Sequence, residues 1–185
     1  MSQFEYLTVV VSLIAAFAIS EILASWGKLI RYRRTVRVYW LHISWSALTL
    51  LLLIHILWGT WNYRALEFSF LQLLALVAPF LTIALGIFVI TPDVSNTHAP
   101  DLREHYFGNK AWFFSIAAAV LVELALVDLY VSGQSLLHPE NVVRFAAVPP
   151  LLLLARSSNE RVHGAAVFIL FGLFAVFIAF AFEPA

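Results

Sequence analysis

Of the ionisable side chains that interrupt the long apolar runs of this sequence, four are best suited to carry chemistry. Glu123 is the most central of them, because it lies 11 residues after Trp112 in a run that ends near Val131. A charged side chain in hydrocarbon costs roughly 2.5–3.5 kcal/mol on insertion scales, so such residues tend to face the interior of a helical bundle. Glu123 is therefore predicted either to exchange a proton or cation, or to be a protonated acid that hydrogen-bonds to a neighbouring helix.

The other candidates for a proton or cation path are Glu21, His55 and Asp128. Glu21 precedes Lys28 by seven residues, about two helical turns, so a weak ion pair or contact with lipid headgroups also explains it. His55 lies deep in its apolar run. It is either a hydrogen-bonded polar group inside the bundle or, if it meets Glu123 in space, part of a relay.

Asp128 differs from these residues because it is close to the end of its apolar run, where it can reach the membrane interface near Tyr130. Arg144 follows after a short turn-rich link. We expect Arg144 to lie near the same interface and to pair with Asp128 or Glu140. An ion-pair role for Asp128 thus competes with a role in a path.

Two histidines in one apolar run, His42 and His55, raise the alternative of haem ligation. They are 13 residues apart, which rotates them about 220° from each other on a helix of 3.6 residues per turn. A haem would therefore need a partner helix or a second copy of the chain. With no cysteine and no H-E-x-x-H, G-x-S-x-G or phosphate-binding glycine motif, the sequence predicts no metal site and no catalytic residues, and an enzyme is the less favoured class.

Composition defines the setting for these side chains. Only 12% of the 185 residues are charged and 62% are hydrophobic, whereas a soluble domain has about 25% charged residues. The formal net charge of zero argues against a nucleic-acid partner, because phosphate binding needs a basic surface. The chain is predicted to be all-α, a single polytopic transmembrane domain over residues 1–185.

About six stretches are long enough to be membrane helices, for which roughly 20 apolar residues are needed. A long polar loop is expected over 91–111, and the fifth stretch is short and contains Pro149 and Pro150, so it is either regular or broken. Pro79 is expected to kink the third stretch. The predicted spans are 4–27, 38–61, 68–90, 112–131, 141–155 and 164–182.

A cluster of cations separates the first two spans and predicts their orientation. Cytoplasmic loops of membrane proteins are enriched in Lys and Arg, so this cluster is assigned to the cytoplasm and both termini to the opposite side. Nine of the 11 cations then fall on the cytoplasmic side. The cluster is also predicted to contact anionic lipid headgroups, and it consists of Lys28, Arg31, Arg33, Arg34 and Arg37.

Small and aromatic side chains predict contacts between helices. Ser12, Ala16, Ser20 and Ala24 recur every fourth residue and form a face that allows close helix packing. In the sixth span a phenylalanine recurs at every third position, from residue 168 to residue 180.

Two functions fit this sequence. The first is a transporter or channel for protons, cations or a small solute that uses the buried carboxylates. The second is a non-catalytic accessory, assembly or sensor subunit that acts through helix–helix contacts. Both predict association, as a homo-oligomer or in a larger membrane complex, with membrane lipids as further partners; a bacterial inner membrane is the expected location.

Overall fold

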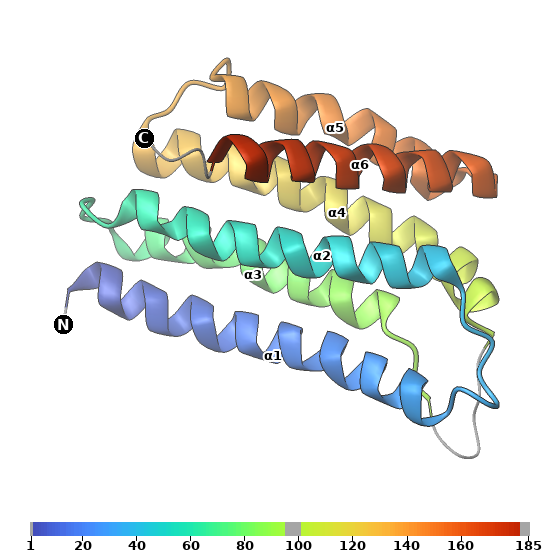
Figure 1. The fold of residues 1–185 in the computed structure, drawn as a ribbon. Coiled ribbons are helices and arrows are strands. Elements are labelled where there is room, and N and C mark those ends of the chain that lie inside the picture. Colours follow the sequence, from blue (N-terminus) through green and yellow to red (C-terminus); the bar gives the residue numbers. More distant parts are fainter. Residues whose placement is uncertain (1, 95–100, 182–185) are drawn as a thin grey trace.

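Six α-helices run back and forth through the part of the chain that the structure, a computed structural model, describes (Figure 1). The described residues are 2–94 and 101–181, with side chains through Ala175. Successive helices alternate in direction, so the start of the first helix and the end of the sixth lie at one end of the bundle, called here the terminal end (Figure 1). The opposite end holds the cationic turn after the first helix and is called the basic-loop end.

The helices are mostly long, as expected for an all-α membrane protein. They are α1 (Gln3–Arg31), α2 (Trp40–Gly59), α3 (Phe70–Ile90), α4 (Leu102–Ser132), α5 (Pro139–Arg156) and α6 (Glu160–Ala181), with a short 3-10 helix η1 (Thr60–Tyr63) after α2. No strand occurs among the described residues.

Side-chain caps fix where several helices begin. Ser2 and Glu5 form a reciprocal capping box at the start of α1, and Ser69 and Gln72 form another at the start of α3. At the start of α4 the Asp101 carboxylate accepts hydrogen bonds from the backbone N–H groups of the first turn. These caps satisfy N–H groups that have no partner within the helix.

Four of the helices, within the described residues, are long and apolar enough to cross a membrane: α1, α2 with η1, α3 and α4. The chain is therefore described as a membrane-embedded helical protein. The apolar run of α5 is flanked and interrupted by three charges, Glu140, Arg144 and Arg156. Six crossings, and termini outside the cytoplasm, stay predictions.

The largest difference from the predicted boundaries is at the start of α4. α4 begins at Leu102, ten residues before the predicted span, so the loop expected over 91–111 ends at Asp101. Apolar runs mark only the part of a helix that can lie in hydrocarbon, and the first turns of α4 are polar. α5 continues unbroken through Pro149 and Pro150 to Arg156, and α3 continues through Pro79.

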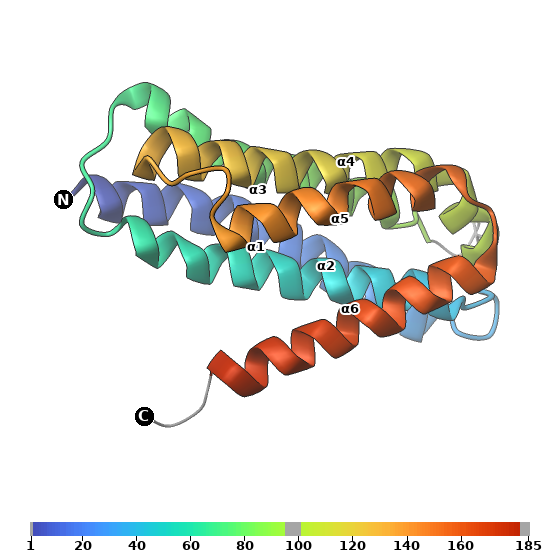
Figure 2. The ribbon, with the colours of Figure 1, turned by 90° about the horizontal axis from the view of Figure 1, so that it is seen from above.

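Two apolar cores fill the bundle. One lies toward the terminal end among α1, α2, α3 and α4, and the other lies toward the basic-loop end and includes residues of α5 and α6. Figure 2 shows that α6 lies near α2 at the basic-loop end and diverges from the bundle toward Ala181. Phe177 and Phe180 of the predicted phenylalanine series lie outside the described side chains.

The small-residue face of α1 does not pack within the chain. Ala16, Ser20 and Ala24 are exposed and Ser12 is half-buried, whereas α1 buries another face that includes Val11 and Ile22. The packing role predicted for this face is thus left to another chain or to lipid.

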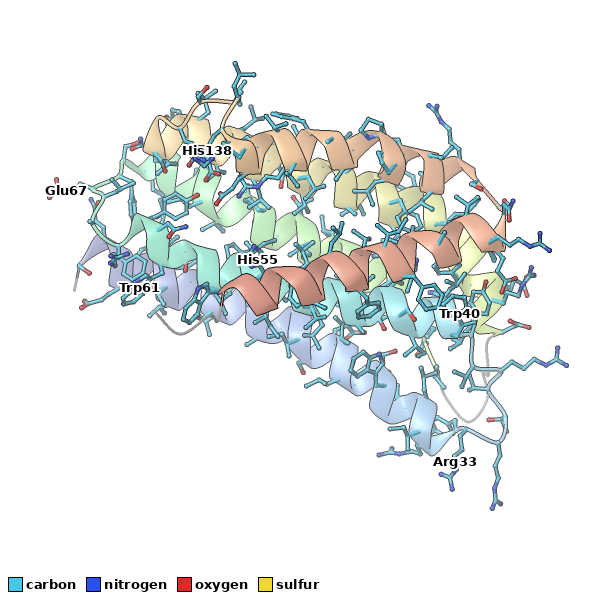
Figure 3. All side chains as sticks on the ribbon, turned by 45° about the horizontal axis from the view of Figure 1, so that its top comes forward. Arg33, Trp40, His55, Trp61, Glu67 and His138 are labelled. Carbon is cyan, nitrogen blue, oxygen red and sulfur yellow. The ribbon has the colours of Figure 1, made fainter. Side chains whose placement is uncertain are left out.

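Cations and aromatic residues are distributed as a membrane helix bundle requires. Figure 3 shows Arg33 and Trp40 at the basic-loop end and Trp61 at the terminal end. Arg31, Arg33, Arg34 and Arg37 are exposed and Lys28 is half-buried. Trp45, by contrast, is 4% exposed and belongs to the core.

Candidate functional site

Glu123 lies between α3 and α4 and is half-buried. Its Oε1 atom accepts a hydrogen bond of 3.0 Å from the Thr82 hydroxyl. Its Oε2 atom is buried and has no hydrogen-bond partner among the described residues. Ser115 and Ala119, which share its helical face, are exposed. One carboxylate oxygen of Glu123 is thus hydrogen-bonded at the α3–α4 interface, and the other is buried without a hydrogen-bond donor among the described residues.

Close packing of α3 on α4 places this carboxylate. A Cβ atom at Gly86 would lie 3.2 Å from Cγ2 of Ile116, so the absence of a side chain allows the two helices to approach. Toward the terminal end, Gln72 Nε2 donates a 3.3 Å hydrogen bond to the Tyr130 carbonyl. Thr82, near the middle of the 21-residue α3, lies between these two contacts.

Asp128 is the centre of a polar group at the terminal end, which we call the Asp128 cluster: Tyr63, Asp128, Glu140, Asn141 and Arg144. The Tyr63 hydroxyl donates to Asp128 Oδ1 at 2.5 Å, and Arg144 Nη1 donates to Asp128 Oδ2. Arg144 also donates to Asn141 Oδ1 at 2.7 Å and lies 3.7 Å from the Glu140 carboxylate. Both predicted partners of Arg144 are confirmed.

The charged pair at the centre of the Asp128 cluster is largely buried, whereas Glu140 is 63% exposed. The side chain of Asp128 is 10% exposed and that of Arg144 is 23% exposed. Asn141 is fully buried and donates from Nδ2 to the Ser135 carbonyl, which ties α5 to the preceding turn. Each ionic group therefore has a compensating partner, unlike Glu123.

His55 does not lie inside the bundle as expected. It is on the exposed face of α2 (Figure 3), within electrostatic range of Arg144 and Glu140. His42, by contrast, is 1% exposed and its ring lies 5.9 Å from that of His105. The two histidines thus occupy different faces of α2, as their 13-residue separation requires, and they do not form a common ligand pair.

Glu21, the fourth candidate, stands apart from the others. It is half-buried on α1, and no hydrogen bond or ion pair found among the described residues includes it. The weak pair expected with Lys28 is not among those ion pairs. The structure therefore places His55 within electrostatic range of Arg144, which pairs with Asp128, places Glu123 on the same helix as Asp128, and leaves Glu21 separate.

Sequence reasoning missed a second buried group at the basic-loop end, which we call the Tyr106 cluster: Tyr39, His42, Trp45, Tyr106 and His163. His163 Nε2 lies 3.0 Å from the Ser157 carbonyl, which can only accept, so Nε2 carries the hydrogen. Nδ1 of His163 therefore accepts the 2.6 Å hydrogen bond from the Tyr106 hydroxyl.

The Tyr106 cluster connects three helices without a charge pair. Tyr106 is 2% exposed and His163, which was predicted to lie in a loop, is fully buried in α6. Tyr39 Oη, His42 Nδ1 and Trp45 Nε1, at every third residue around the start of α2, are buried with no hydrogen-bond partner among the described residues. Tyr39 precedes α2, and burial, followed by the neighbouring Glu160 carboxylate, raises its pKa to about 12.

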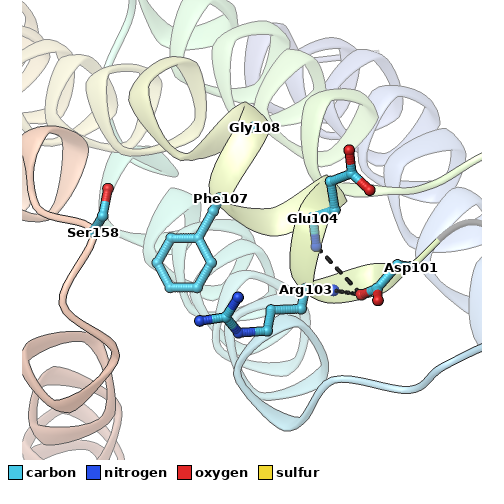
Figure 4. Close-up of a pocket in the computed structure, with 6 residues that line it drawn as sticks. All are labelled: Asp101, Arg103, Glu104, Phe107, Gly108 and Ser158. Atoms are coloured by element: carbon cyan, nitrogen blue, oxygen red, sulfur yellow. Dashed lines mark hydrogen bonds between the residues drawn. The ribbon is translucent and has the colours of Figure 1, made fainter.

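An open pocket of about 470 Å³ lies beside this cluster at the start of α4 (Figure 4). The Arg103 guanidinium lies over the Phe107 ring, 5.2 Å from its centroid, and 3.6 Å from the Glu160 carboxylate. Asp101, which caps α4, lies 3.9 Å from Arg37. Asp101 and Arg103 on this rim each have a partner of opposite charge, whereas none of the ion pairs found among the described residues includes the exposed Glu104, so we assign the pocket no ligand.

The described residues contain no group of three or more His, Cys, Asp or Glu side chains that could hold a metal ion. Compared with protein-family models, with curated proteins and with solved structures, the chain has no match. The functional conclusion therefore depends on the geometry of Glu123 and the two clusters.

Proposed function

We propose that this membrane-embedded protein is a small transporter or channel for protons or small cations, with Glu123 as the group that binds the transported ion. The observation that supports this most is the buried, unpartnered Oε2 atom of Glu123 opposite the middle of α3. An ionised carboxylate at that depth is costly. A proton or a cation on Oε2 would remove the cost.

Access from the terminal end would pass the Asp128 cluster. Asp128 is five residues from Glu123 on α4, about 7.5 Å along the helix axis at 1.5 Å per residue. On α3, Pro79 has no N–H, so the Ala75 carbonyl lacks its usual helical donor and is available to an ion or a water molecule. Glu123 and the Ala75 carbonyl thus belong to the same helix pair, whereas Asp128, about 140° further around α4, contacts Tyr63 and Arg144.

Flux measured in proteoliposomes tests this proposal. We expect wild-type protein to dissipate an imposed proton or cation gradient, and Glu123→Gln to fold normally yet abolish the flux. Glu67→Gln is the matched control, because Glu67 is an exposed carboxylate in the loop before α3. Unchanged flux in Glu123→Gln would refute the role of this residue.

A second candidate, an accessory or assembly subunit, is favoured by one observation: the small-residue face of α1 is exposed. We expect Ala16→Leu or Ser20→Leu to dissociate a homo-oligomer or larger membrane complex while the isolated chain stays folded. Leu85→Phe, at an exposed position of α3, is the control. Under this candidate Glu123→Gln would have no effect. A bacterial inner membrane is proposed as the location for either function.

A further inference from the structure

A second open pocket, of about 620 Å³, lies where α6 meets α2 at the basic-loop end. Its floor is apolar and consists of Trp40, Gly164, Ala165 and Phe168. A Cβ atom on residue 164 would approach Trp40 Cη2 to about 3.2 Å, and the rings of Trp40 and Phe168 lie 6.0 Å apart. Gly164 therefore allows the indole to pack closely against α6.

Polar groups occupy only one rim of this pocket, at the start of α6. They are Asn159, Glu160 and Arg161. Glu160 has a partner, because its carboxylate lies 3.6 Å from Arg103 Nη2. None of the ion pairs found among the described residues includes Arg161, which is exposed. The rim thus offers one uncompensated positive charge directly above an apolar floor.

The apolar floor continues along α6 away from the basic-loop end. Phe168 is 72% exposed and Ile169 is 61% exposed, and α6 diverges from α2 beyond them (Figure 2). Trp40 is 44% exposed at the level where tryptophan is enriched at membrane interfaces. A ligand that fits must be anionic at one end and hydrocarbon at the other.

We propose that the pocket between α2 and α6 binds a glycerophospholipid with a net negative headgroup. Its phosphate would contact the Arg161 guanidinium, and one acyl chain would lie along Trp40, Ala165 and Phe168. Arginine suits this role because its planar guanidinium donates two parallel hydrogen bonds to phosphate oxygens. This site is separate from Glu123 and does not depend on transport.

Native mass spectrometry of the delipidated protein tests the site, with phosphatidylglycerol and phosphatidylethanolamine of identical chains as probes. We expect phosphatidylglycerol to bind more tightly, and Arg161→Gln to weaken that binding about fivefold, the effect of one cation near a lipid surface. Arg156→Gln, which removes an exposed cation at the same end outside the pocket and outside the cationic cluster after α1, should leave the binding unchanged.

A third variant tests the floor without changing the charge. Ala165 is exposed, so Ala165→Phe is tolerated sterically. It should weaken the binding of both lipids, because the larger side chain fills the apolar floor of the pocket. It also keeps the proposal open to refutation if Arg161→Gln does not fold. Equal binding of the two lipids, or equal effects of Arg161→Gln and Arg156→Gln, would mean that the pocket holds only ordinary boundary lipid. Displacement of phosphatidylglycerol by the same concentration of glycerol phosphate would make it an anion site with no chain groove.

Discussion

Buried polar groups have different kinds of partner at the two ends of the bundle. In the Asp128 cluster a carboxylate and a guanidinium compensate each other, and Tyr63 and Asn141 complete their hydrogen bonds. In the Tyr106 cluster the central bond joins two neutral side chains, Tyr106 and His163. The Asp128 cluster depends on strong ionic interactions, so the loss of one partner is expected to destabilise it severely. The Tyr106 cluster depends on weaker hydrogen bonds between neutral groups.

The two clusters also differ in how far apart their members lie in the sequence. Four members of the Asp128 cluster lie between Asp128 and Arg144, on either side of one short turn, whereas Tyr106 and His163 are 57 residues apart. The Asp128 cluster therefore stabilises one helical hairpin, and the Tyr106 cluster holds α6 against α2 and α4. Between them, Glu123 has one hydrogen-bond partner among the described residues, Thr82, and its other oxygen is buried without one. Glu123 thus lies between a cluster of paired charges and a cluster of neutral side chains.

The largest expected effect comes from breaking the ionic cluster. Asp128→Ala leaves Arg144 largely buried without its main partner, and removal of one member of a buried pair costs about 3–5 kcal/mol. Because Arg144 keeps Glu140 and Asn141 and is 23% exposed, we expect the lower limit, about 3 kcal/mol. Unfolding in detergent measures this loss.

An exposed ion pair supplies the control. Arg37→Gln breaks the 3.9 Å contact with Asp101, in which the Arg37 side chain is 87% exposed, and should change the stability by less than about 1 kcal/mol.

A double-mutant cycle tests whether Asp128 and Arg144 are coupled. The loss of stability in the double variant Asp128→Asn/Arg144→Gln should be smaller than the sum of the losses in Asp128→Asn and in Arg144→Gln. Strict additivity would mean that the two side chains are not coupled.

A smaller effect is expected for the neutral cluster. Tyr106→Phe removes the hydroxyl and leaves His163 Nδ1 buried without a donor, which costs about 1–3 kcal/mol. Tyr130→Phe, at a tyrosine that is 53% exposed on the same helix, should stay within about 0.5 kcal/mol of the wild type. If the two variants unfold alike, the Tyr106–His163 bond contributes nothing to holding α6.

The smallest effect appears only at alkaline pH. Tyr39 has a pKa of about 12 in the folded protein and 10.0 in the reference state, so the folded state keeps its proton longer. Its contribution to stability is then complete below pH 10 and is lost as the pH rises toward 12. Tyr39→Phe should flatten the decline of stability over this range. If the stability of Tyr39→Phe declined as steeply as that of the wild type, the decline would be due to other titrating groups.

The sequence predicts the helices and one cluster well, and the other cluster poorly, for physical reasons. Apolar runs identify helices wherever lipid or core demands them, so α1, α2 and α3 are found to within a few residues. Asp128 and Arg144 could be paired in advance because a short turn brings their helices together. Apolar runs do not reveal the polar turns by which a helix extends beyond its apolar part, which is why Tyr106 and His163 are both predicted to lie in loops.

Faces of helices were harder to predict than the helices themselves. His55 was expected inside because it is deep in its run, but depth along a helix does not determine direction around it, and His55 is exposed. The small-residue face of α1 is a different case: α2 and α3 cover another face of this helix, so the role of Ala16 and Ser20 in contacts between helices stays a prediction.

Infrared difference spectroscopy of the reconstituted protein tests the central claim, that Glu123 exchanges a proton or cation, most directly. We expect a carboxyl band that changes when the pH or the cation concentration is changed, and that is absent from Glu123→Gln but retained in Glu67→Gln and Glu21→Gln. A spectrum in which Glu123→Gln shows the same changes as the wild type would contradict the account, because Glu123 would then be a fixed contact between α3 and α4.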